Sequence, residues 1–290
     1  MIRVLDVVAQ QRWLDRIGDL LQQGISAAFE SLGTDTRAVK NLLHGTWVGH
    51  PLHPILTDVA IGGWTTAVAP DLLDQVADDE LTASGADAAL GLGLLGAVGS
   101  AITGANDWQH TDGKPRRLGV AHAVLNATAT ALFTTSLIAR LAGSRSSGRW
   151  LAWLGLGVST GAAYIGGDLV FGEQIGVNHA AGQSIPDDYT AALPHAEMHE
   201  DEPHLAKVGG TRVVLVRHGG RIHALAETCS HLGGPLAEGT LGNGGIICPW
   251  HGSRFNLEDG SVLDGPATFP QPCFDVRVQD GQIEVRQAPS

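Results

Sequence analysis

Two short segments near the carboxyl end, Cys229-Ser-His231 and Cys248-Pro-Trp-His251, decide the fold of this chain. Each segment places a histidine shortly after a cysteine and so offers one sulfur and one nitrogen donor. This spacing suits two loops that face each other across a metal centre. Pro249 restricts the backbone at the start of the second loop, and Gly252 allows a tight turn at its end. Together they let the backbone of this loop pass close to the metal.

The mixed donors predict a particular kind of iron-sulfur centre. Two cysteine thiolates can hold one iron of a 2Fe-2S cluster while two neutral imidazoles hold the other, which raises the reduction potential above that of an all-cysteine cluster. The predicted metal ligands are Cys229, His231, Cys248 and His251. A structural zinc site of two cysteines and two histidines is the alternative, but such motifs normally begin with a closely spaced cysteine pair.

Residues 226–274 resemble a Rieske domain of the ferredoxin type. The resemblance is carried by Cys-Ser-His-Leu-Gly and Cys-Pro-Trp-His-Gly-Ser-Arg-Phe, and it places the four predicted ligands on the family's ligand positions. Rieske proteins of respiratory complexes carry one extra cysteine in each loop, where this chain has Gly234 and Trp250. We therefore expect no disulfide between the loops.

The resemblance also predicts the environment of the cluster. High-potential members place a serine and a tyrosine after the last ligand, and both donate hydrogen bonds to the cluster. This chain keeps Ser253 but has Phe255 in the place of the tyrosine. Because such donors stabilise the added electron, we expect an intermediate to low potential within the Rieske range of about −150 to +300 mV.

Alternating apolar residues around the two motifs predict a small β domain. A hairpin is expected from residues 212–217 and 221–225 around Gly219 and Gly220, and a second from residues 274–278 and 283–285. The β domain therefore extends over residues 194–290, with the metal site at one tip.

The composition of the 290 residues excludes some classes of protein. A net charge of −12 argues against a nucleic-acid partner. Of the three cysteines two are predicted ligands, which leaves no disulfide pair and indicates a reducing compartment. Residues 1–11 lack the pattern of a cleavable signal, and no repeat of fixed period is visible.

Four segments between the amino-terminal region and the β domain are nearly free of charge: residues 55–69, 88–106, 118–139 and 150–167. A helix needs about 20 apolar residues to span a bilayer. Their glycine and alanine content suits close packing of helices in lipid. We expect a four-helix transmembrane bundle, with a soluble alanine- and glycine-rich bundle as the alternative.

The predicted fold class is therefore a multidomain protein in which an all-α four-helix transmembrane bundle precedes an all-β Rieske domain. The expected domains are amphipathic N-terminal helices (1–48), the membrane domain (49–181), a linker (182–193) and the Rieske domain (194–290). Residues 12–32 form an amphipathic pattern that suits the membrane surface, a partner chain or packing on the bundle.

Charges in the connectors predict the orientation. The first connector, residues 71–87, is acidic, whereas the second holds Lys114, Arg116 and Arg117. The positive-inside rule then puts both chain ends in the cytoplasm, although the basic third connector, residues 140–149, points the other way. We expect a multi-pass protein of the cell membrane whose Rieske domain faces the cytoplasm.

The motif His50-Pro51-Leu52-His53-Pro54 is similar to a signature of poorly characterised four-helix membrane domains that are sometimes fused to Rieske domains. This resemblance implies the architecture of the bundle and little of its chemistry.

Polar residues in the membrane segments indicate a second site, because ionisable groups in lipid are costly. In an up-and-down bundle they gather at one leaflet: His50, His53, Asp58, Asp107, His110, His122, Asn126 and Asp168. A b-type haem would be held by His53 and His122, with His50, His110 or His179 as substitutes. Three alternatives to the haem stay open: a metal held by Asp107 and His110, a quinone or proton site, and a purely structural role of the polar residues.

The leading hypothesis is a membrane-anchored Rieske iron-sulfur protein that transfers single electrons between a cytoplasmic redox partner and a haem or quinone site at the bundle. A redox sensor or scaffold and the ferredoxin component of an oxygenase system are the alternatives. The sequence shows no nucleophile or substrate motif, so we expect an electron carrier rather than a self-contained enzyme; as an enzyme it would be an oxidoreductase. The expected partners are a reductase or electron acceptor, membrane lipid and quinone. The sequence does not determine whether the protein forms a homo-oligomer, which proteins donate and accept the electrons, or in which direction the electrons flow.

Overall fold

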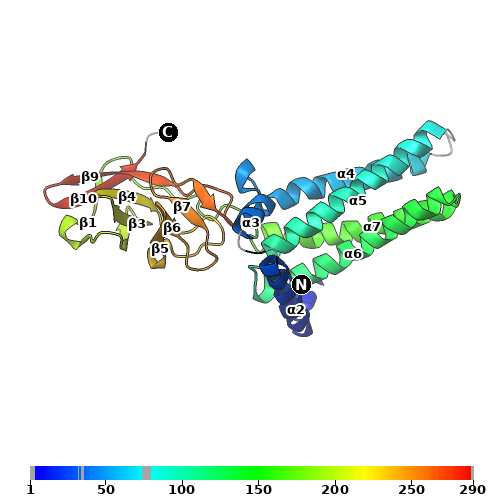
Figure 1. The fold of residues 1–290 in the computed structure, drawn as a ribbon, viewed down its shortest axis with the longest axis horizontal. Helices are drawn as coiled ribbons and strands as arrows, with labels where there is room; N and C mark the ends of the chain where they lie inside the picture. The colour runs from blue at the N-terminus through cyan, green and yellow to red at the C-terminus, as the bar shows by residue number, and fades with distance from the viewer. Residues whose placement is uncertain (1–3, 32, 34–35, 74–79, 289–290) are drawn as a thin grey trace. The chain divides into compact units, whose positions relative to one another are not determined.

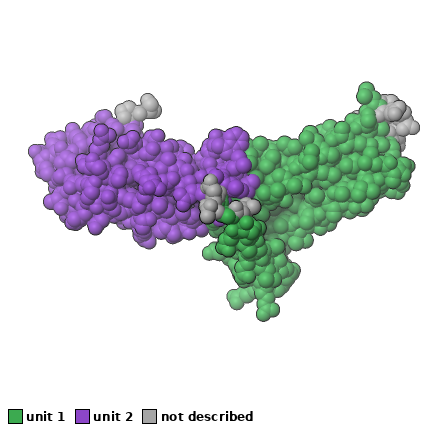
Figure 2. All heavy atoms as spheres, viewed as in Figure 1, with its two compact units in different colours: residues 1–36, 52–175 green, residues 37–51, 176–290 purple. Residues whose placement is uncertain are grey.

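A computed structural model describes the chain except for residues 1–3, 32, 34–35, 74–79 and 289–290. It divides into two compact units (Figure 2). The first comprises residues 1–36 and 52–175 and is helical; the second comprises residues 37–51 and 176–290 and is mainly β. The predicted class of a helical region followed by a β domain is confirmed, whereas the exact domain limits stay predictions.

The described residues hold seven α-helices rather than four (Figure 1). The four long helices that the apolar segments predict are α4 to α7, and three further helices precede them. Their bounds are α1 Val4–Ala9, α2 Trp13–Ser31, α3 Thr36–His44, α4 Leu52–Leu73, α5 Glu80–Trp108, α6 Gly113–Leu141 and α7 Arg145–Phe171. Residues 74–79 of the acidic connector lie outside the described residues.

Three of the four long helices are long and apolar enough to cross a membrane: Leu81–Trp108, Gly113–Leu141 and Arg145–Phe171. Helix α4 falls short of that hydropathy because His53, Pro54 and Asp58 occupy its first turns and glycines and threonines follow. Its membrane crossing stays a prediction.

The long helices pack as two hairpins, α4 with α5 and α6 with α7. Glycines bring the backbones of the first hairpin together. A Cβ atom on Gly63 would lie 2.6 Å from the backbone nitrogen of Gly93, and one on Gly96 would lie 2.7 Å from that of Ala60. In lipid the hydrophobic effect does not drive helices together, and close van der Waals packing at small residues stabilises their contact instead.

The two hairpins repeat the same contacts. Trp64 of α4 stacks on Phe133 of α6, with ring centroids 4.3 Å apart and planes 17° apart. Each ring also packs against a glycine on the other helix of its hairpin: Trp64 against Gly93 of α5, and Phe133 against Gly155 of α7. The bundle is therefore an internal pair of equivalent hairpins. The connectors within them differ in length, so the repeat has no fixed period in the sequence.

The second unit contains two antiparallel sheets. A six-stranded sheet has the order β1-β10-β9-β4-β3-β2 and a four-stranded sheet the order β5-β6-β7-β8. The strands are β1 Thr190–Pro194, β2 Pro203–Val208, β3 Thr211–His218, β4 Arg221–Ala226, β5 Thr240–Gly242, β6 Gly245–Ile247, β7 Arg254–Asn256, β8 Val262–Asp264, β9 Cys273–Gln279 and β10 Gln282–Gln287.

Both predicted hairpins are confirmed. Strands β3 and β4 join through Gly219 (φ 59°) and Gly220 (φ 75°), and β9 and β10 join through Asp280 (φ 50°) and Gly281 (φ 77°). Positive φ at both central positions is typical of type I′ turns, whose twist matches that of the strands.

Strand β3 is buried on both faces and so supports two cores. Val213 and Leu215 pack into one cluster between β2 and β10. Val214 and Val216 face the other side, where the cluster includes the sulfur-bearing residues Cys229 and Cys248. Since successive side chains of a strand alternate, β3 ties the metal-site core to the main sheet.

The segment that precedes α4 packs on this β unit. The Asn41 amide donates to Asp264 Oδ1 (3.0 Å), and its oxygen accepts from the Gly265 backbone nitrogen (2.9 Å). His44 is buried against Gly265. Residues 37–51 thus belong structurally to the unit that carries the metal site.

We predict that Gly63→Ala lowers the stability of the bundle by about 1–3 kcal/mol, because the added methyl meets backbone atoms that have little room to move. Gly62→Ala is the matched control, since Gly62 is exposed and has no atom within 4 Å of the added methyl. Thermal unfolding of the detergent-purified variants tests this. Equal unfolding temperatures would contradict the packing described above.

Candidate metal centre

The two ligand loops share one hydrogen-bond pattern. In each, the cysteine N–H donates to a carbonyl at the loop's end, and a glycine N–H donates back to the cysteine carbonyl. The pairs are Cys229 N with Gly234 O (2.8 Å) and Gly233 N with Cys229 O (2.9 Å), then Cys248 N with Ser253 O (2.8 Å) and Gly252 N with Cys248 O (3.1 Å). Gly233 (φ 78°) and Gly252 (φ 77°) adopt the left-handed region that glycine favours.

The structure brings the four predicted ligands together. Cys229 and Cys248 are 1% and 3% exposed, and their thiols hydrogen-bond to each other. The rings of His231 and His251 are half-buried, with centroids 5.1 Å apart and planes at 90°. The sulfurs therefore lie inside the core and the imidazoles nearer the surface, beside the exposed Trp250.

The two thiols share a hydrogen bond that separates their pKa values. The hydrogen bond with Cys229 lowers the pKa of Cys248 to about 7, and the same contact raises the pKa of Cys229. Backbone N–H groups of residues 231 and 232 approach the Cys229 sulfur, and those of residues 250 and 251 approach the Cys248 sulfur. Converging donors of this kind stabilise thiolates, which are the form of cysteine that binds metal.

The loops approach each other too closely for a side chain at Gly234. A Cβ atom there would lie 2.7 Å from the Cys248 sulfur and 3.1 Å from the Trp250 ring. The glycine in the first loop therefore makes room for the sulfur of the second.

Comparisons with known proteins agree with this geometry. Residues 188–275 match the family model described as the Rieske [2Fe-2S] domain. Ferredoxin CarAc of Metapseudomonas resinovorans is 37% identical over 79 residues, which cover 27% of this chain and 74% of that ferredoxin. This chain belongs to the Rieske [2Fe-2S] family. The anthranilate 1,2-dioxygenase ferredoxin subunit of Burkholderia cepacia is 33% identical over 31% of this chain and 82% of its own length.

The Rieske match covers only part of other relatives and of this chain. Apoptosis-inducing factor 3 of Homo sapiens is 34% identical over 104 residues, which are 36% of this chain but 17% of that protein. Residues 49–184 match a different model, described as a predicted membrane protein (DUF2231). Both parts of the predicted organisation are thus confirmed, and the Rieske domain implies a 2Fe-2S cluster. The donor set of two buried sulfurs and two imidazoles fits that cluster.

Ser253 and Phe255, the residues expected in the environment of the cluster, are both buried beside the second ligand loop. Ser253 is fully buried, and its hydroxyl oxygen accepts from the Ala267 backbone nitrogen (3.0 Å). Its hydroxyl proton is then available for another acceptor. Phe255 is fully buried in the core that contains both cysteines. The phenyl ring supplies no hydroxyl donor there.

Gln271 was not predicted from the sequence and holds the first loop in place. Its amide donates to Ala226 O (2.7 Å) and Thr228 O (2.6 Å), and its oxygen accepts from Ser230 N (3.0 Å). The side chain is 2% exposed. A single amide between Pro270 and Pro272 in an otherwise apolar run is the signal that would have indicated this role.

His53 and His122 occupy equivalent places in the two hairpins of the bundle. His53 Nδ1 pairs with Ser100 O (2.8 Å), and its ring lies against Gly104. His122 Nδ1 pairs with Ala162 O (2.9 Å), and its ring lies against Gly166. Each glycine follows the carbonyl residue by one helical turn, so the two contacts are the same.

Other predicted members of the polar cluster lie elsewhere. Asp58 is exposed on the outer surface of α4. His50 lies beside Phe269 with ring centroids 6.3 Å apart, and the His179 N–H donates to Ser230 O (3.1 Å), so both belong to the β unit. Their role as substitute haem ligands stays a prediction.

We predict that Gly234→Ala lowers the iron content per chain several-fold, because its methyl group competes for space with the Cys248 sulfur. Gly182→Ala is the control, since nothing lies within 4 Å of its added methyl. Iron analysis and visible absorption of the purified variants measure the effect. Full cluster loading of Gly234→Ala would show that the loops do not need this close approach.

Proposed function

We propose that this chain is a membrane-anchored electron carrier whose Rieske cluster exchanges single electrons with a cytoplasmic redox protein. The observation that carries the proposal is the tip of the β unit, where two buried sulfurs and two half-buried imidazoles converge in a chain that also holds helices of membrane length. A 2Fe-2S cluster supplies one-electron chemistry, and the protein sets its potential and its access.

In this proposal Cys229 and Cys248 hold one iron and His231 and His251 hold the other. The buried sulfurs keep water from their iron, and the outer sides of the imidazoles reach the surface next to Trp250. A partner that docks over Trp250 would then approach the histidine-ligated iron.

Membrane anchoring and a cytoplasmic Rieske domain are part of the proposal. The match of residues 49–184 to a predicted membrane protein supports anchoring. Basic residues Lys114, Arg116 and Arg117 at the α5–α6 connector support the orientation.

For the site at the bundle we favour a b-type haem over a quinone. The number of residues from His53 to Trp64 on α4 is the same as from His122 to Phe133 on α6. Because this separation is close to a whole number of helical turns, each histidine lies on the same face of its helix as the aromatic residue. Trp64 and Phe133 meet in the core, and His53 and His122 lie the same number of residues before them on α4 and α6, which supports the two imidazoles as a ligand pair. A ring Nδ1 bonded to a carbonyl leaves Nε2 as the basic nitrogen, the usual state of a histidine ligand. The Nε2 of His122 now accepts from the Asn126 amide (3.0 Å), which a haem iron would displace.

A ferredoxin of an oxygenase system is the second candidate. Two relatives, Ferredoxin CarAc and the anthranilate 1,2-dioxygenase ferredoxin subunit, favour it by name. Turnover with a ferredoxin-dependent oxygenase in place of a membrane acceptor would distinguish it from the leading proposal.

We predict that Cys248→Ser abolishes the cluster, because the thiolate donor is lost. Cys273→Ser is the control, since the Cys273 sulfur contacts Gln271 O (3.7 Å) and is not a proposed ligand. Iron and acid-labile sulfide should both be about two per chain in the control and near zero in Cys248→Ser. Circular dichroism of both variants checks folding. Retention of iron and sulfide by Cys248→Ser would refute the assigned ligand.

Ser253→Ala should lower the midpoint potential of the cluster, because the lost hydroxyl no longer stabilises the added electron. We expect a shift of about 60 mV, which corresponds to a tenfold change in a one-electron equilibrium. Thr211→Ala is the control, because that hydroxyl donates to Ser184 O (2.6 Å) at the start of β3. A redox titration followed by visible absorption measures both, and an unchanged potential in Ser253→Ala would remove the serine from the cluster environment.

The haem assignment predicts a Soret band and a pyridine haemochrome in protein produced with an adequate haem supply. Both signals should vanish in His53→Ala and in His122→Ala and persist in His223→Ala, whose histidine lies on β4. Protein with a full Rieske cluster and no haemochrome would contradict the haem and leave the electron-carrier proposal standing.

A further inference from the structure

Helix α2 docks along the side of the bundle at the start of α6. Leu14 and Gly18 are buried in this contact. A Cβ atom on Gly18 would lie 3.1 Å from Arg116 Cδ, so the glycine lets the arginine side chain pass beneath the helix. The contact lies within the first unit.

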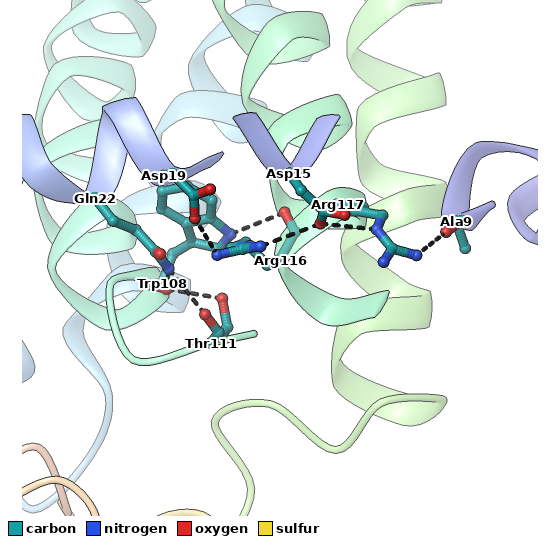
Figure 3. Close-up of polar contacts among 8 residues, drawn as sticks. All are labelled: Ala9, Asp15, Asp19, Gln22, Trp108, Thr111, Arg116 and Arg117. Carbon is teal, nitrogen blue, oxygen red and sulfur yellow. Dashed lines mark hydrogen bonds and ion pairs between the residues drawn. The ribbon is translucent and has the colours of Figure 1, made fainter. Parts of the chain in front are cut away.

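Polar contacts fix the rotation of α2 about its axis (Figure 3). Gln22 Nε2 donates to Thr111 O (2.8 Å), and Asp19 pairs with Arg116 (2.6 Å). Asp15 accepts from Arg117 Nε (2.9 Å) and from Arg116 (3.2 Å). The hydrogen bond from Arg117 lowers the pKa of Asp15, which keeps that carboxylate charged.

These polar side chains point toward the α5–α6 connector, as Figure 3 shows. The connector lies where α5 ends at Trp108 and α6 begins at Gly113, and both helices are of membrane length. The connector between them therefore lies at one surface of the bilayer, where the chain passes from the hydrocarbon core into water. The flank of α2 that holds Asp15, Asp19 and Gln22 faces the aqueous side of that level.

The opposite flank of α2 is apolar and uncovered. At about 100° per residue, Trp13, Leu20 and Leu21 lie across the helix from Asp15, Asp19 and Gln22. Trp13 is 61% exposed, Leu20 69% and Leu21 45%. Since the polar flank faces the connector, this apolar flank faces along the outer wall of the bundle toward the bilayer.

We propose that α2 lies in the membrane–water interface, with Trp13, Leu20 and Leu21 inserted among the lipid chains and its polar flank bound to the start of α6 and to the connector before it. Two features favour lipid over a protein partner. Tryptophan is enriched at the membrane–water interface, and the exposed Arg16 lies at the border of the two flanks, where it can reach lipid phosphates. The inference concerns lipid binding and does not depend on the identity of the cluster or of a bundle cofactor.

The test compares two positions of α2 in the full-length chain reconstituted into phosphatidylcholine and phosphatidylglycerol vesicles. A nitroxide is attached at Leu20→Cys on the apolar flank and at Ser26→Cys, an exposed position on the side of Asp15 and Asp19, with the unsubstituted protein labelled in parallel as background. Collision with oxygen, which concentrates in lipid, is compared with collision with a water-soluble nickel chelate. We expect Leu20→Cys to collide several-fold more with oxygen than with nickel and Ser26→Cys to show the reverse.

Two results would overturn the proposal. Equal access of nickel to both labels would mean that the apolar flank faces water. Shielding of the Leu20→Cys label from both reagents would mean that protein covers the flank, either a second copy or a partner chain. Retention of the visible absorption of the cluster in both variants verifies that the labelled proteins are folded.

Discussion

Burying two thiolates next to each other is unfavourable unless a cation neutralises them, and the β unit is organised around that constraint. Cys229 and Cys248 are almost fully buried, and their sulfurs are in hydrogen-bonding contact. Each loop directs backbone N–H groups at its sulfur and closes on itself through the same pair of hydrogen bonds. Gly234 allows the contact, and Gln271 holds the first loop to the sheet. The 2Fe-2S cluster that the Rieske match implies would supply the positive charge that compensates two buried thiolates.

The membrane unit follows a different rule, because small residues rather than hydrophobic burial bring its helices together. Gly63 and Gly93 let α4 and α5 touch, and Trp64 and Phe133 join the two hairpins in the middle. The equivalence of the hairpins gives His53 and His122 the same contacts. In this arrangement each histidine joins the two helices of its hairpin through a hydrogen bond from Nδ1 to a backbone carbonyl.

The sequence predicts those features whose chemistry is local. The ligand spacing, the type I′ hairpins with Gly219-Gly220 and Asp280-Gly281, and the apolar helices all depend on short patterns, and the structure contains them. Short patterns cannot predict contacts between segments that are distant in the sequence. Asn41 binds Asp264 and Gly265, and Gln271 binds the first ligand loop, because the folded chain brings these segments together. The repeat of the two hairpins could not be predicted from the sequence, because their unequal connectors remove a fixed period.

The central claim is that one iron of the cluster is held by two histidines at the surface of the β unit. Pulsed EPR of the dithionite-reduced protein in its membrane fraction tests this most directly, because directly bound nitrogens give strong hyperfine couplings to the unpaired electron. We expect two distinct strongly coupled nitrogens, with one of them lost when His231 or His251 is replaced by cysteine. A reduced cluster without strongly coupled nitrogen, or protein with zinc and no EPR signal, would contradict it.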